Sequence, residues 1–530
     1  MTRGAEVARD YILHSISTLG VGKEGMGYHT AGMAHLNVLA LAMANRGTDL
    51  FTLARFRTMF DRWMLWTMQP YGRFWATNGD LGTFPPSPAL VQVAHWLFPE
   101  DSGIGLVARQ SAPARTLNIV AEVALLQLLC PAELGTDYGD QTPPVFPAGL
   151  PLSLHDPERG VLFTRTSWGP EALTLQFNAR SDTTFPSHDH PDRGEFFFTA
   201  LGQAWTVPSM RETESKYHGV ITIDGIGQGY FPTPATWLDV HDSAAGTTAT
   251  VDLKYCYDWR WMKSSFLADD SQLQAEPWLE WVREPRDRLL ARAPRTTWER
   301  DPLPGVRAYY ETWQAGDPRM WDAEDAWVLR AANVPVRKAY RSLALVRGAQ
   351  PFVIVADDIR RDDVEHLYEW RMILPMTVEA HSLSGADIIL GPVSSEHDAK
   401  LRGDSAYKDV GRPVAPKGTP LLLVRVLQIG KPKFPELTPN PAVETVEFVK
   451  HDDVHQFAGR STGLGRRLVL PSRSVEPRYR VLLFPYHAGE KLPETKWETP
   501  DILNVTAVGT TSRVKFATAA DGSPRLQILP

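Results

Sequence analysis

Residues 160–180 read GVLFTRTSWGPEALTLQFNAR, and residues 194–202 read GEFFFTALG. Both stretches place β-branched and aromatic residues in short runs that end at Gly, Pro or Asp, as strands joined by turns do. Similar runs follow at HGVITIDG (218–225), PFVIVADDI (351–359) and RYRVLLFPY (478–486). Because these runs do not alternate with helical patterns, they predict a large antiparallel sandwich and exclude a doubly wound nucleotide-binding fold.

The residues before this stretch have helical periodicity. HLNVLALAMANRG (35–47) ends at a glycine, LFTLARFRTMFDRWMLWTMQ (50–69) stops before Pro70, and PALVQVAHWLF (88–98) has the same spacing of apolar residues. We therefore expect a helical domain over 1–135, a central antiparallel β-sandwich over 136–400 and a C-terminal β-sheet region over 401–530. A polar or helical insertion is expected near 268–300.

Composition excludes several classes of protein. The 530 residues are 43% hydrophobic and 22% charged, which is ordinary for a folded domain. The net charge of −7 argues against a nucleic-acid partner. No run of 18 apolar residues is present, so no membrane helix is expected. Cys130 and Cys256 are too few for a disulfide framework.

The densest group of chemically active side chains is SHDHPDRGEFFF at 187–198. His188 and His190, two residues apart on an extended segment, point to the same side, and Asp192 follows at the same spacing. Histidine is both the usual metal ligand and the usual acid or base near neutral pH. The stretch therefore predicts a functional site.

Two metal-binding patterns share part of this stretch. A metallo-β-lactamase pattern would need histidine at position 193, where the chain has Arg193. The spacing of His188, His190, Glu195 and Gly202 is similar to that of a cupin. However, Asp182 stands where a cupin has glycine, and no second half-motif follows.

A third pattern covers more of the chain, roughly residues 20–490. The stretches GVLFTRTSWGPEALTLQFNA, HDHPDRGEFFFTALGQAW and SKYHGVITIDGIGQG resemble, in order and spacing, the central sandwich of heparinase II/III-like polysaccharide lyases and the related oligoalginate lyases. Glu24-Gly25-Met26-Gly27-Tyr28-His29 is similar to a helix start in that family. The resemblance implies an α+β fold, an N-terminal incomplete (α/α) toroid followed by a large antiparallel β-sandwich (supersandwich).

The resemblance also implies roles for individual residues. Tyr28 matches the family's general acid or acid–base, His188 matches its catalytic histidine, and His29 is a further catalytic candidate. Candidate contacts to the substrate are the groove residues Asn78 and Trp75 and the guanidinium groups of Arg165 and Arg193, since guanidinium suits a planar anion.

Zinc is the cofactor that the resemblance implies, in a structural role. His190 and His218 match positions that bind it in part of the family. The family's third ligand is an aspartate, and Val207 occupies that position here. Asp192 is the predicted substitute ligand, with Glu195 as the other carboxylate in reach.

The predicted function is a lyase that cleaves an acidic, uronate-containing polysaccharide or oligosaccharide by β-elimination. A uronyl C5-epimerase and a non-catalytic glycan-binding scaffold without the upstream helices are the alternatives. Residues 1–20 lack the apolar core of a signal peptide, so a cytoplasmic protein is expected if the chain is complete, and a periplasmic or secreted one if the start is truncated. The partners expected are this acidic glycan and, for a large enzyme of this kind, a second copy of the chain in a homodimer.

Overall fold

The computed structural model describes most of the chain. The described residues are 2–69, 86, 88–111, 145–181, 190–207, 215–228, 235–263, 329–333, 336–393, 418–430, 441–449 and 461–530. The predicted insertion at 268–300 lies outside them, as does Cys130.

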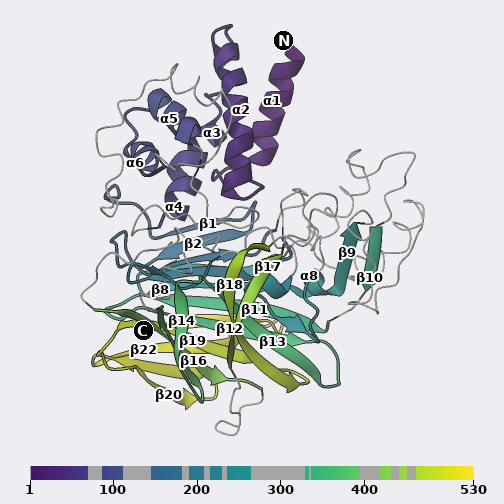
Figure 1. Ribbon diagram of the computed structural model, residues 1–530, viewed down its shortest axis with the longest axis vertical. Helices are drawn as coiled ribbons and strands as arrows, with labels where there is room; N and C mark the ends of the chain where they lie inside the picture. The colour runs from purple at the N-terminus through teal and green to yellow at the C-terminus, as the bar shows by residue number, and fades with distance from the viewer. Residues whose placement is uncertain are drawn as a thin grey trace.

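The N-terminal part is helical and lies at one end of the molecule (Figure 1). Its elements are α1 (Thr2–Ser15), α2 (Met26–Ala44), α3 (Ala54–Thr58), the π-helical turn η1 (Met59–Met64), α4 (Leu65–Thr67), α5 (Pro88–Leu97) and α6 (Ser102–Ser111). The helix predicted over 50–69 is thus a succession of α3, η1 and α4. Asp101 begins α6, because its Oδ1 accepts the backbone N–H groups of Gly103 at 3.0 Å and Ile104 at 3.1 Å.

Five antiparallel strands form the first sheet, in the order β1-β2-β3-β4-β5. They are β1 (Ser153–Asp156), β2 (Val161–Arg165), β3 (Thr174–Asn178), β4 (Glu195–Ala200) and β5 (Gln203–Ala204). Every residue of β2, β3 and β4 is buried. Leu175 and Phe177 face the main core, whereas Val161 and Phe163 pack against the helices. The sheet is therefore covered on both faces.

The largest sheet has eight strands, in the order β14-β15-β16-β19-β12-β11-β8-β7. They are β7 (Thr236–Ser243), β8 (Gly246–Asp252), β11 (Lys338–Val346), β12 (Phe352–Arg360), β14 (Val378–Ser384), β15 (Asp387–Pro392), β16 (Pro420–Gln428) and β19 (Tyr479–His487). The predicted domain boundary at residue 400 falls between β15 and β16, which are hydrogen-bonded neighbours in this sheet.

The eight-stranded sheet lies between two cores. On one face, Val353 and Val355 pack with Trp370 and with residues of the first sheet. On the other face, Ile354 packs against the C-terminal sheet through Val514. The remaining elements are η2 (Ser215–Tyr217), β6 (Thr222–Ile223), α8 (Lys254–Asp258), β9 (Trp259–Lys263), β10 (Leu329–Asn333), β13 (His366–Leu374), β17 (Ala442–Val449), β18 (Ser461–Ser474), β20 (Glu494–Thr499), β21 (Ile502–Ala507), β22 (Thr510–Thr518) and β23 (Pro524–Leu529).

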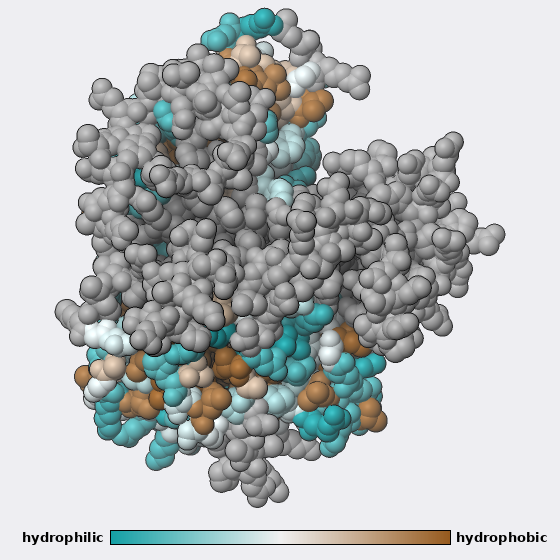
Figure 2. All heavy atoms as spheres, viewed as in Figure 1, coloured by the Kyte–Doolittle hydropathy of each residue, from teal (hydrophilic) through white to brown (hydrophobic). Residues whose placement is uncertain are grey.

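The architecture is thus a helical N-terminal part followed by a large antiparallel, sandwich-like β part, as predicted at that level (Figure 1). Figure 2 shows hydrophobic residues scattered among hydrophilic ones over the β part on the face in view. No helix in the described part of the chain is long and apolar enough to cross a membrane.

Candidate active site

Hydrogen bonds and a shared core hold the helical part against the first sheet. Gln69 Oε1 accepts the hydroxyls of Thr174 and Thr199, each at 2.8 Å. Arg165 Nη2 donates to the carbonyl of Trp66 at 2.6 Å, and its guanidinium lies 3.7 Å from the centre of the Trp168 ring. Burial lowers the pKa of Arg165 to about 9. This predicted substrate contact therefore joins the end of α4 to β2.

The first turn of α2 carries two of the predicted catalytic residues. Tyr28 is half-buried, and His29 is fully buried, with its ring edge-on to Trp63 at 5.4 Å between centroids. Burial, and then the charges of Arg159 and Lys23, lower the pKa of His29 to about 3. His29 is consequently neutral at ordinary pH, and Tyr28 is the more accessible of the two.

The loop before α2 rests on the β1–β2 turn. The Ser17 hydroxyl donates to Asp156 Oδ2, and Arg159 donates from Nη2 to the carbonyl of His14 at 2.8 Å and from Nε to the carbonyl of Val21 at 3.4 Å. A side chain at Gly22 would place its Cβ 2.6 Å from the His29 ring, so the approach of loop and helix requires glycine there. These contacts fix the start of α2 beside the sheet.

Two amide side chains on β3 were missed by the sequence analysis. Gln176 is opposite Phe163, and Asn178 is opposite Val161, so both amides are on the face toward the helices. Both are buried, and among the described residues neither amide has a hydrogen-bond partner. Buried polar groups are almost always bonded, so these two amides are expected to bind a further partner such as an ordered water or a ligand. The signal in the sequence was the polar residue at every second position of TLQFN.

Three predicted site residues lie outside the described residues. His188 falls in the segment 182–189, between β3 and β4, and Trp75 and Asn78 fall in 70–85. The first segment starts four residues after Asn178 and ends next to His190, and both of these are described.

A buried group of histidines and carboxylates follows at the start of β4. Ligand atoms of Asp192, Glu195 and His218 lie within 4.8 Å of one another. His218 Nδ1 is 3.1 Å from Glu195 Oε2, and the His190 ring is 5.1 Å from the His218 ring between centroids. Burial opposes the charged form of His218, but the Glu195 and Asp192 carboxylates together outweigh it and raise the pKa of His218.

Arg193, another predicted substrate contact, braces the turn that carries this group. Its Nη1 donates to the carbonyl of His190 at 2.9 Å and lies 3.4 Å from Asp192 Oδ1. Its backbone N–H donates to Gln228 Oε1 at 2.9 Å, and its carbonyl accepts Gln228 Nε2 at 2.6 Å. Arg193 is 3% exposed, so it holds the turn from inside the protein.

A buried ion pair ties the same turn to the eight-stranded sheet. Arg341 Nη1 donates to the carbonyls of Gly194 at 2.6 Å and Gly219 at 2.5 Å, and Arg341 Nε donates to Asp357 Oδ1 at 2.7 Å. Asp357 also accepts the indole N–H of Trp370 at 3.0 Å. The histidine–carboxylate group is therefore anchored in the main core.

The donor set of this group suits a divalent metal. Imidazole and carboxylate are ligands that zinc accepts, and these side chains are buried and close together. Of the three predicted ligands, Asp192 and His218 belong to the group and His190 is next to it, with Glu195 as the additional carboxylate. Val207 is buried and apolar, and its backbone N–H donates to Ile373. It supplies no ligand.

Solved structures with a similar fold are polysaccharide lyases. The heparan sulfate lyase HepC from Pedobacter heparinus matches with a TM-score of 0.54 and 11% identity, over 99% of this chain and 61% of that chain. A heparinase III matches with a TM-score of 0.55 and 10% identity, over 96% of this chain and 62% of that chain. No protein-family model and no curated protein matches the sequence. The heparinase-like resemblance is thus confirmed at the level of the fold, and the chain spans about three-fifths of those structures.

Proposed function

We propose that the chain is a lyase that cleaves an acidic, uronate-containing polysaccharide by β-elimination, between the helical part and the first sheet. The reaction removes the proton at C5 of a uronate, next to its carboxylate, and expels the oxygen at C4. It requires a base, an acid for the leaving group and groups that stabilise charge on the carboxylate. In this proposal the helical part is an incomplete (α/α) toroid.

One observation carries the proposal. The loop before α2, and with it the helix start that carries Tyr28, is bonded to the β1–β2 turn of the sheet. On β3 of the same sheet, the amides of Gln176 and Asn178 have no partner among the described residues. The chain then runs from β3 through His188 to the buried histidine–carboxylate group at β4. A phenol, an imidazole and two amide groups are the kinds of side chain that the elimination needs.

The proposal gives each of these residues a role. Tyr28 protonates the leaving oxygen, and His188 takes the C5 proton or neutralises the carboxylate. Asn178 and Gln176 donate to the carboxylate, while Asn78 and Trp75 contact the neighbouring sugar. Arg165 and Arg193 donate to backbone carbonyls and so stabilise the backbone around the site. His29 is a neutral neighbour of Tyr28.

Zinc belongs to the proposal as a structural ion. His218, Asp192 and Glu195 would hold it, with His190 beside them, and the ion would supply a fixed positive charge that locks the turn before β4. We expect purified protein to contain about one equivalent of zinc by elemental analysis, and His218→Ala to lose it. Parent protein that melts at the same temperature with zinc and after removal of zinc by a chelator would contradict this part.

The test of the main proposal is ultraviolet absorbance of the new C4–C5 double bond. The protein is incubated with heparan sulfate, chondroitin sulfate, hyaluronan and alginate, and Tyr28→Phe serves as the control. A rise in absorbance with one glycan, absent in the variant, supports the lyase. If no glycan gives a product, the lyase is wrong, and incorporation of solvent deuterium at C5 would then identify an epimerase.

A further inference from the structure

A groove is lined by strands that include β20 and β22, which lie at the end of the molecule opposite the helices (Figure 1). It has a volume of about 390 Å³ and lies between the eight-stranded sheet and the C-terminal sheet. β11, β12, β16 and β19 contribute one wall, and β20, β22 and β23 contribute the other. This volume is in the range of roughly 300–1,000 Å³ that is typical of small-ligand sites.

The described lining of this groove is positively charged, although the whole chain is acidic. It carries Lys338, Arg478, Arg480 and Arg525 against one carboxylate, Asp358, in a chain of net charge −7. Arg480 is paired with Asp358, since its Nη2 lies 2.9 Å from both carboxylate oxygens. Lys338 and Arg478 both pair with Glu476, and Arg525 Nη2 lies 3.9 Å from Asp521 Oδ2. Four cations thus face three carboxylates, and the one positive charge in excess favours an anionic ligand.

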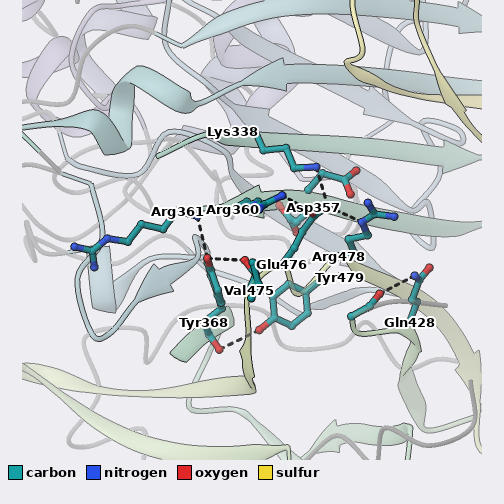
Figure 3. Close-up of polar contacts among 12 residues, drawn as sticks. Lys338, Asp357, Arg360, Arg361, Tyr368, Gln428, Val475, Glu476, Arg478 and Tyr479 are labelled. Atoms are coloured by element: carbon teal, nitrogen blue, oxygen red, sulfur yellow. Dashed lines mark hydrogen bonds and ion pairs between the residues drawn. The ribbon is translucent and has the colours of Figure 1, made fainter. Parts of the chain in front are cut away.

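Glu476, in the turn between β18 and β19, organises two of these cations (Figure 3). Its Oε1 accepts Lys338 Nζ at 2.8 Å and Arg478 Nε at 2.5 Å, and Arg360 Nη1 lies 4.0 Å from its Oε2. One carboxylate thus faces three cations. The Arg478 side chain remains 42% exposed and the Lys338 side chain 30% exposed, so both can reach a ligand.

The backbone of this turn is held in an unusual conformation. Arg478 has a φ of 47°, in the left-handed region that costs a non-glycine residue about 1 kcal/mol or more. The turn keeps this conformation because the carbonyl of Pro477 accepts the N–H of Gly430, and the carbonyl of Val475 accepts the Tyr368 hydroxyl at 3.2 Å. Strain held by surrounding contacts is typical of residues that present a side chain for binding.

Aromatic side chains form part of the groove. Trp497 and Phe516 are 5.2 Å apart between ring centroids, with their planes inclined at 43°, and Tyr340 also lines the groove. All three are partly exposed. Aromatic rings beside cations suit a ligand that is apolar on its ring faces and charged at its edges, which describes an acidic sugar.

We propose that this groove binds a stretch of anionic oligosaccharide, distinct from the stretch that enters the active site. Naming the ligand as an acidic glycan rests on the proposed function, whereas the charge and the aromatic lining do not. Arg478, Arg525 and Lys338 contact the carboxylate or sulfate groups, and Trp497 stacks on a sugar ring. A polymer bound here stays attached between cleavage events.

The experiment counts binding sites by isothermal titration in a Tyr28→Phe background, which prevents cleavage. The probes are size-defined hexasaccharides of heparan sulfate and of alginate. The groove variant is Arg478→Gln with Arg525→Gln, and Lys338→Gln is a second, single variant. Arg513→Gln is the matched control, because Arg513 on β22 pairs with Glu498 at the surface and does not line the groove.

We expect two hexasaccharides per chain for the background protein and for Arg513→Gln. The double variant should lose one site, with a dissociation constant raised about tenfold or more, as the loss of two charge-assisted contacts predicts. Two sites that persist in both groove variants would contradict binding in the groove, without bearing on the lyase proposal. Binding that depends on the groove alone, together with a parent protein that gives no unsaturated product from any of the glycans, would support the groove and contradict the lyase. If neither probe binds, the proposal that the groove binds an acidic oligosaccharide is wrong.

Discussion

Asn178 at the end of β3 and Glu195 at the start of β4 are opposite each other in the sheet, and both are almost completely buried. Glu195 is bonded to His218 and to the N–H of Gly219, and its neighbourhood is braced by Arg193, Gln228 and Arg341. The amide of Asn178 has no partner among the described residues. Buried polar groups with partners stabilise the fold, and buried polar groups without them cost stability unless a ligand pairs with them. The difference separates supporting residues from candidate binding residues on adjacent strands.

The largest expected effect concerns Tyr28 and His188, which, like Asn178, are candidate residues for binding or catalysis and not part of the bonded network around Glu195. Tyr28→Phe and His188→Ala should each reduce lyase turnover by about 10³-fold, which is typical for loss of an acid or base. Because neither change removes a described structural contact of the Glu195 network, the melting temperature should stay nearly unchanged. Turnover and thermal melts are measured on the same samples. A silent Tyr28→Phe with an unfolded His188→Ala would show that the site is misplaced.

The next largest effect concerns Arg341, one of the residues that support the network around Glu195. Arg341→Met leaves Asp357 buried without its partner and frees the carbonyls of Gly194 and Gly219. We expect the free energy of unfolding in urea to fall by about 3–5 kcal/mol. Arg513→Met, which breaks the exposed pair with Glu498, is the matched control and should cost about 1 kcal/mol or less. Equal losses in the two variants would contradict the anchoring role of Arg341.

Asn178→Ala tests the unpaired amide directly. We expect kcat/KM to fall by about 10- to 100-fold, and the free energy of unfolding to change by less than about 1 kcal/mol, because the change leaves no described residue without a partner. Thr174→Val, on the same strand, is the contrasting variant. It removes the hydroxyl bonded to Gln69 and should lower stability with little effect on kcat/KM. A large loss of stability in Asn178→Ala would show that Asn178 stabilises the fold and would contradict a role in binding.

The smallest effect is a pH dependence that comes from His29. Its pKa is about 3 in the folded protein and ordinarily 6.5, so the unfolded chain binds a proton below 6.5 that the folded chain does not. Its neutral packing therefore stabilises the protein fully above that pH and progressively less as the pH falls toward 3. At about pH 5.5 the loss is roughly 1.2 kcal/mol relative to pH 7. Urea unfolding at both values should show this loss in the parent and a smaller one in His29→Gln.

Much of the β part was predictable, since apolar runs such as 161–165, 174–178, 352–360 and 479–487 are strands. Other local patterns misled. HGVITIDG was expected to be one strand, but only Thr222–Ile223 pairs, because Gly219 and its neighbours serve the histidine–carboxylate group. Residues 248–259 (TATVDLKYCYDW) also have the composition of a strand, but β8 ends at Asp252 and a helical turn follows, because Asp252 Oδ1 accepts the N–H of Lys254.

In the site, a motif could show which residues carry the chemistry but could not show their partners. The sequence suggested Arg165 and Arg193 as substrate contacts because guanidinium suits anions. Their carbonyl partners, Trp66 and His190, depend on how the helices pack on the sheet and how one turn folds. Gln176 and Asn178 showed only the alternation of polar residues in TLQFN, which is also typical of a strand with one face in water. Only the tertiary structure shows that both faces of β3 are buried.

The strand order of the eight-stranded sheet also affects how the chain folds while the ribosome is still translating it. β12 pairs on one side with β11, which precedes it directly, and on the other side with β19, so that Val353 meets Leu483. More than a hundred residues must therefore be translated before β12 has its second neighbour. Until then an apolar strand keeps an open edge, which is where nascent chains associate wrongly. Slowed translation before residue 479 should lower the yield of folded protein more than slowed translation near the N-terminus.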